Sequence, residues 1–94
     1  MNEYQKYILG ALTNRELLEQ LAEEASELSQ AALKVIRAKG LSNNPTPVNE
    51  CDAYSNLKEE LYDVLAVASL LGIVDYDDND NHKWERWAKR LGKR

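Results

Sequence analysis

The stretch "LAEEASELSQA" (residues 21–31) decides the fold, because its leucines and alanines recur at helical spacing. At about 100° per residue, Glu24 lies about 20° from Leu17, within the apolar stripe of this helix. Glu27 lies at the edge of the stripe, beside Ala31. The stripe itself comprises Leu17, Leu21, Leu28 and Val35. Two acids therefore occupy the face that we expect to be buried.

A second stretch, "LKEELYDVLAVASLLG" (residues 57–72), places acids in a similar way. Glu60 falls beside Val64 on the apolar face, and Asp63 lies on its flank. We expect the buried face to comprise Leu57, Leu61, Val64 and Ala68. After Tyr62 this helix is apolar on nearly all sides, which is typical of a helix enclosed by neighbours within one chain or across an oligomer.

The whole chain reads as helices joined by loops, with no sustained alternation that would indicate a strand. Thr13 and Glu16 form a capping box, and Gly40 and Gly72 mark the ends of the two main helices. Asp80 is the expected N-cap of the last helix. We expect helices at about 2–11, 13–40, 51–71 and 80–92, separated by loops at about 40–50 and 72–81. The fold class is therefore all-α.

Composition narrows the class of protein. The 94 residues suit one small domain, residues 1–94, whose modest core favours association with further copies. The net charge of −4 argues against a nucleic-acid-binding protein. One cysteine and one histidine exclude a zinc site and an internal disulfide. The sequence shows no signal-peptide core and no apolar run long enough for a membrane span, so we expect a cytoplasmic protein without a membrane partner.

The acids in the apolar stripes require an explanation, because an ionised carboxylate buried there costs several kcal/mol unless it is paired or binds a metal. A single E-x-x-E pair is common on helix surfaces, where the acids are solvated or paired with lysines. Two pairs on two long helices indicate a shared site formed by Glu24, Glu27, Glu60 and Asp63. Oxygen ligands without histidine or thiolate suit a hard cation, Mg²⁺ or Mn²⁺.

Two other metal sites are disfavoured. Di-iron carboxylate bundles carry Glu-x-x-His on two helices, whereas Glu27 and Asp63 stand at the corresponding positions here. The acidic loop at residues 75–86 begins like a calcium loop. However, Asp80 replaces its required glycine and Arg86 replaces its bidentate glutamate, so we reject an EF-hand.

The C-terminal segment is strongly basic, since six of the twelve lysines and arginines lie in the last twelve positions. They suit either a solvated helix end, which the helix dipole favours, or a cluster that faces phosphate. Trp84 and Trp87 lie three residues apart, so they either pack against the other helices or stack on a base.

The motif E-x-x-E in "LAEEASEL" followed by E-x-x-D in "EELYDVL" resembles the MazG-like all-α nucleoside triphosphate pyrophosphohydrolase superfamily over roughly residues 14–94. The resemblance implies a four-helix bundle, with two long helices carrying the acidic motifs and a core completed in a homodimer or homotetramer. It implies Mg²⁺ held by the four acids, Mn²⁺ being the alternative ion. It also implies hydrolysis of (deoxy)nucleoside triphosphates to monophosphate and pyrophosphate, in nucleotide-pool housecleaning.

The resemblance also suggests residues that contact the substrate. Lys83 and Arg86 match loosely a K-x-x-[NR] element of the final helix that approaches the phosphates. Tyr62, beside the acids, is a candidate neighbour of the base or ribose. The residue that activates the attacking water is left open among an acid of the second motif, Glu23 and Glu59.

Two alternatives compete with this reading. A phosphoribosyl-ATP pyrophosphohydrolase is similar around the first motif, but the proline-bearing loop at 40–50 and the form "EELYDVL" favour the first reading. A non-catalytic helical oligomerisation or regulatory module is the other class. That module predicts ordinary carboxylates that face solvent.

Overall fold

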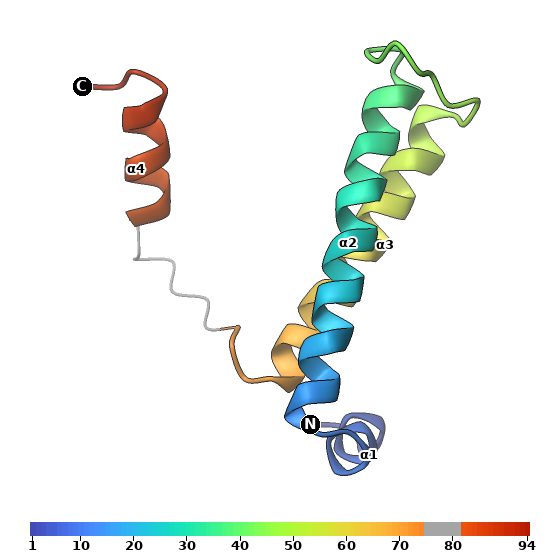
Figure 1. The fold of residues 1–94 in the computed structure, drawn as a ribbon, viewed down its shortest axis with the longest axis vertical. Coiled ribbons are helices and arrows are strands. Elements are labelled where there is room, and N and C mark those ends of the chain that lie inside the picture. Colours follow the sequence, from blue (N-terminus) through green and yellow to red (C-terminus); the bar gives the residue numbers. More distant parts are fainter. Residues whose placement is uncertain (75–81) are drawn as a thin grey trace.

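The computed structural model describes residues 1–74 and 82–94, and the described residues form helices and no strand. The helices are α1 (Glu3–Ala11), α2 (Asn14–Ala38), α3 (Glu50–Leu70) and α4 (His82–Arg90), as Figure 1 shows. The all-α prediction is confirmed. The expected N-cap Asp80 and most of the acidic loop lie outside the described residues. None of the described helices combines the length and the apolar composition that crossing a bilayer requires.

The ends of α2 and α3 follow the local signals in the sequence. The Thr13 hydroxyl oxygen accepts a hydrogen bond from the Glu16 backbone N–H at 3.2 Å, and Glu16 Oε1 accepts from the Thr13 backbone N–H at 3.0 Å. The Thr13 backbone N–H and hydroxyl both donate to Glu16 Oε1, and these two bonds lower the pKa of Glu16 because they stabilise its charged form. Gly40 and Gly72 end the two helices at φ values of 73° and 70°, where a side chain would be strained. The predicted capping box and both glycine stops are confirmed.

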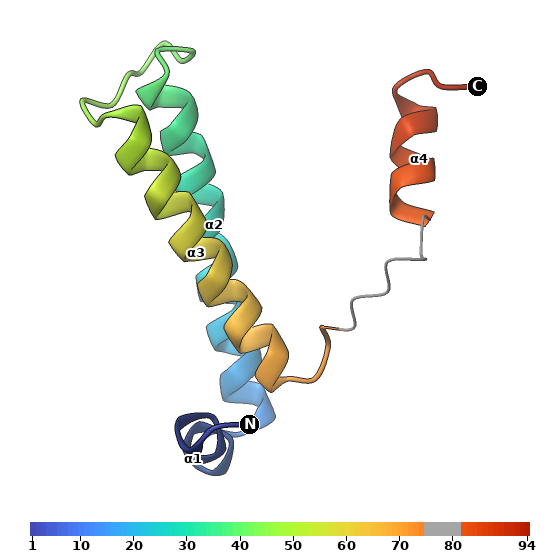
Figure 2. The same cartoon turned by 180° about the vertical axis from the view of Figure 1, so that it is seen from behind.

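Helices α2 and α3 pack side by side as an antiparallel hairpin, which both views show (Figures 1 and 2). The buried residues are Leu17, Ala31, Val35, Ala53 and Ala68. Leu17 is 2% exposed and is the largest fully buried side chain among the described residues. The core of the hairpin is therefore a narrow seam that is rich in alanine.

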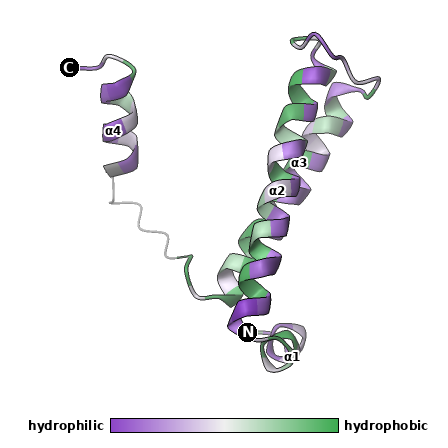
Figure 3. Cartoon of the chain, in the orientation of Figure 1, coloured by the Kyte–Doolittle hydropathy of each residue, from purple (hydrophilic) through white to green (hydrophobic). Residues whose placement is uncertain are grey.

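The outer faces of the hairpin remain exposed, and one prediction is wrong. Leu61, expected on the buried face of α3, is 43% exposed. Leu65 and Tyr62 are 42% and 57% exposed, so α3 is not enclosed on all sides within this chain. The physical reason is that α3 packs extensively against one described helix, α2. Figure 3 shows apolar residues along both helices beside strongly hydrophilic ones.

Helix α4 stands away from the hairpin in both views, so the four helices do not form a bundle within the single chain (Figures 1 and 2). Trp84 and Trp87 stack on one another, with their ring centroids 6.1 Å apart. Their exposed fractions are 61% and 48%, so the expected packing of these rings against other helices is not seen in this chain. A bundle of four helices would require another arrangement of α4 or another copy of the chain.

We expect Leu17→Ala to lower the free energy of unfolding by about 2–5 kcal/mol, because the substitution leaves a cavity in the seam. The matched substitution Leu18→Ala, at a side chain that is 54% exposed, should cost about 1 kcal/mol or less. Urea unfolding followed by circular dichroism measures both values. Equal losses at the two positions would contradict the packing described for α2.

Candidate metal centre

Three acids from the two helices of the hairpin converge. Glu24 comes from α2, and Glu60 and Asp63 come from successive turns of α3. One carboxylate oxygen of each lies within 4.8 Å of the other two. Glu24 and Glu60 are half-buried, whereas Asp63 is exposed. The structure thus brings together three of the four acids that the sequence singled out.

Two oxygens in this cluster lack hydrogen bonds. Glu24 Oε2 and Glu60 Oε2 are buried, and neither has a partner among the described residues. The other oxygen of Glu24 accepts a hydrogen bond of 2.8 Å from Gln20 Nε2, one turn earlier on α2. Gln20 therefore orients the Glu24 carboxylate and leaves its second oxygen free for another ligand. Buried acceptors without partners are costly, so the cluster favours a bound cation.

Glu27 lies beside this cluster and is sensitive to its charge. The charge of Glu24 raises the pKa of Glu27, with further contributions from desolvation and from Glu60. Glu27 is exposed and lies outside the group of three converging oxygens. It therefore borders the candidate centre rather than completing it in the present geometry.

The spacing of the three oxygens is suited to a hard divalent cation. Mg²⁺ binds carboxylate oxygens at about 2.1 Å, so ligands on opposite sides of one ion lie about 4.2 Å apart. The oxygens of Glu24, Glu60 and Asp63 lie within 4.8 Å of one another, close enough for the three carboxylates to be candidate ligands of one ion. Glu24 and Glu60 are half-buried and form no ion pair with the described residues, and a divalent cation would balance their charge.

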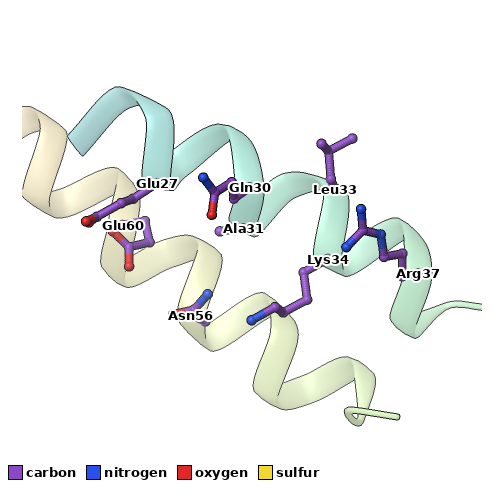
Figure 4. Close-up of a pocket in the computed structure, with 8 residues that line it drawn as sticks. All are labelled: Glu27, Gln30, Ala31, Leu33, Lys34, Arg37, Asn56 and Glu60. Carbon is purple, nitrogen blue, oxygen red and sulfur yellow. The ribbon is translucent and has the colours of Figure 1, made fainter. Parts of the chain in front are cut away.

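A pocket of about 480 Å³ adjoins the cluster between α2 and α3. Figure 4 shows Glu27 and Glu60 at one end of it and Lys34 and Arg37 toward the other. The remaining lining residues are Gln30, Ala31, Leu33 and Asn56. Pockets of this size accommodate small molecules. The acidic and basic ends would suit a ligand that carries both a metal ion and negative charge.

The other predicted substrate contacts lie elsewhere. Tyr62 is exposed on α3, and Lys58 Nζ lies 5.8 Å from its ring centroid. Tyr62 is not among the residues that line the pocket. Lys83 and Arg86 line a separate basic hollow on α4 with Lys89 and Arg90. In this chain α4 stands apart from the acids (Figure 1).

The structure also adds residues that the sequence interpretation missed. Gln20, Lys34, Arg37 and Asn56 contact the acids or line the pocket. Helical spacing carried a signal for Gln20, which precedes Glu24 by four residues, and for Asn56, which precedes Glu60 by four. Lys34 follows Glu27 by seven residues and so shares its face.

Comparison of the chain with protein-family models, with curated proteins and with solved structures gives no match. The resemblance carried by the two acidic motifs therefore remains a prediction. The inference of function depends on the chemistry of the cluster and of its pocket.

We expect millimolar Mg²⁺ to raise the Tm of the protein by roughly 4 °C or more, because binding to the folded state alone stabilises it. Glu60→Gln should abolish this shift. Without metal, its Tm should equal or exceed that of the wild type, because one half-buried charge is removed. Thermal unfolding with and without Mg²⁺ gives both values.

The matched control is Glu59→Gln, which removes an exposed charge from the preceding position of α3. This variant should keep the Mg²⁺-dependent shift. A full shift in Glu60→Gln would contradict the metal centre.

Proposed function

We propose that this protein is a cytoplasmic Mg²⁺-dependent (deoxy)nucleoside triphosphate pyrophosphohydrolase that acts in nucleotide-pool housecleaning. The observation that carries the proposal is the convergence of carboxylates from Glu24, Glu60 and Asp63, with two buried oxygens that have no hydrogen-bond partner within residues 1–74 and 82–94. An adjoining pocket with acidic and basic ends supports it. The two E/D motifs that resemble this superfamily supply the reaction class.

In the proposed reaction, the side chains and the bound ion have separate roles. When bound, Mg²⁺ neutralises phosphate oxygens and lowers the cost of bringing a polyanion to a carboxylate cluster. Glu24, Glu60 and Asp63 hold the ion, and Gln20 fixes the orientation of Glu24. A water oxygen forms a bond to the α-phosphorus. The bond from that phosphorus to the α,β-bridging oxygen breaks, and pyrophosphate leaves with the electron pair.

Glu27 is the acceptor that we assign to the proton of the attacking water. It lines the pocket and lies outside the three-oxygen group, so a water bound in the pocket would lie beside its carboxylate. Before an ion binds, the charge of Glu24 raises the pKa of Glu27, and a bound Mg²⁺ would offset that charge, so the assignment depends on the position of Glu27 beside the pocket. Mn²⁺ should replace Mg²⁺, because both are hard cations that prefer oxygen ligands.

We further propose that the working form is a homodimer or a homotetramer. Leu61 and Leu65 on α3, and Ile36 on α2, are 42% to 43% exposed. A hairpin of two helices leaves these outer faces without cover, and a second copy would bury them.

Incubation with a panel of nucleotides and Mg²⁺, followed by ion-exchange separation of the products, tests the reaction. We expect nucleoside monophosphate and pyrophosphate in equal amounts. Asp63→Asn and Glu60→Gln should each reduce turnover at least about a hundredfold, because each removes a negatively charged ligand. The control Glu19→Gln, at an exposed acid of α2 that pairs with Arg15, should retain activity.

Each alternative gives a different result in this assay. Nucleoside diphosphate and orthophosphate as products would contradict cleavage between the α- and β-phosphates. Cleavage of phosphoribosyl-ATP but of no triphosphate would assign the chain to histidine biosynthesis. Absence of turnover together with absence of a Mg²⁺-dependent thermal shift would favour a helical oligomerisation module.

The proposed assembly predicts that Leu65→Lys weakens association, because it places a charge on the outer face of α3. The same substitution at Leu41, which is 74% exposed in the loop after α2, serves as the control. Light scattering after gel filtration measures the mass. A monomeric wild type, or an unchanged oligomer in Leu65→Lys, would contradict this interface.

A further inference from the structure

The pocket beside the acids contains two cations that the proposed metal centre does not use. Lys34 and Arg37 lie on the pocket face of α2, beyond Gln30 (Figure 4). Lys34 is exposed and Arg37 is half-buried. Neither side chain takes part in a hydrogen bond or an ion pair with any of residues 1–74 or 82–94.

The arrangement of these cations differs from that of other basic residues on the helices. Arg15 pairs with Glu19 at 3.1 Å, and Lys89 pairs with Glu85 at 3.2 Å, each one helical turn away. Lys34 and Arg37 have no acid three or four residues away on either side. They are also three residues apart, so their like charges repel. An anion bound between them would relieve that repulsion.

The lining of the pocket selects the kind of ligand. Its apolar members are Ala31 and Leu33, and none of the described residues that line it is aromatic, so these residues offer no ring on which a base could stack. The amides of Gln30 and Asn56 lie between the acidic and basic ends. Lys34 follows Glu27 by seven residues, which is a rise of about 10 Å along the helix. A chain of phosphates fits this order of charges better than a nucleoside does.

We propose that Lys34 and Arg37 bind the terminal phosphates of the substrate, the part that leaves as pyrophosphate. This inference depends on the proposed function, and it gives the bound triphosphate a direction. The α-phosphate lies at the carboxylates of Glu24, Glu60 and Asp63, the terminal phosphates extend along the pocket toward the C-terminus of α2, and the nucleoside lies outside the pocket. Arginine and lysine both bind phosphate through charge-assisted hydrogen bonds.

Inorganic pyrophosphate is the direct probe of this subsite, and isothermal titration calorimetry in Mg²⁺ measures its affinity. The double substitution Lys34→Ala/Arg37→Ala should weaken pyrophosphate binding at least about tenfold, because two charge-assisted contacts are lost. The control Lys6→Ala/Arg15→Ala removes the same charge from α1 and the start of α2, and it should change the affinity less than about twofold. The Mg²⁺-dependent thermal shift of all variants should equal that of the wild type.

A further double variant distinguishes this subsite from the basic residues of α4. Lys83→Ala/Arg86→Ala should leave pyrophosphate affinity within about threefold of the wild type if the cations of α2 carry the binding. Unchanged affinity in Lys34→Ala/Arg37→Ala, with the Mg²⁺ shift retained, would overturn the inference and leave the metal centre standing. Loss of affinity only in the α4 variant would also overturn it. No Mg²⁺ shift in the wild type would instead show that the proposed function has failed.

Discussion

Repulsion between carboxylates across the α2–α3 hairpin is the constraint on which the rest of the structure depends. Glu24 and Glu60 approach from opposite helices, and each has a buried oxygen without a hydrogen-bond partner in the described part of the chain. The same charges raise the pKa of Glu27. Packing of the helices holds these groups together against their repulsion. A divalent cation would convert this unfavourable contact into the strongest link between the two helices.

The small side chains of the seam explain why the acids can meet. Ala31 on α2 and Ala53 and Ala68 on α3 are buried, and the distance between packed helices depends on the side chains at their contact. Alanines therefore allow the backbones to lie close enough for short acidic side chains to converge. The same sparse packing leaves room for the pocket between Glu27 and Arg37. A seam filled with large residues would have closed that space.

The inner and outer faces of the hairpin differ in chemistry. The inner face carries a graded sequence of charge, from the acids through the amides of Gln30 and Asn56 to the cations of α2. The outer face carries exposed apolar residues, including Leu61 and Leu65. The inner face is suited to an ion and its phosphate ligand, and the outer face to another copy of the chain. Because the two faces are separate, a second copy of the chain could cover the outer face of the hairpin without blocking the pocket on the inner face.

The sequence alone determined the helices, their ends and the acidic pairs, because each depends on residues only a few positions apart. Thr13 caps through bonds to a residue three positions away, Gly40 adopts a backbone conformation that other residues avoid, and E-x-x-E places two acids on one face by helical geometry. The tertiary structure decided which side chains meet across the hairpin. Sequence analysis did not predict that Lys34 and Arg37 line a pocket with Glu60, and its prediction that Leu61 is buried was wrong. Both outcomes depend on how far one helix slides and turns against another and on which faces remain uncovered, and no periodicity within a single helix specifies these.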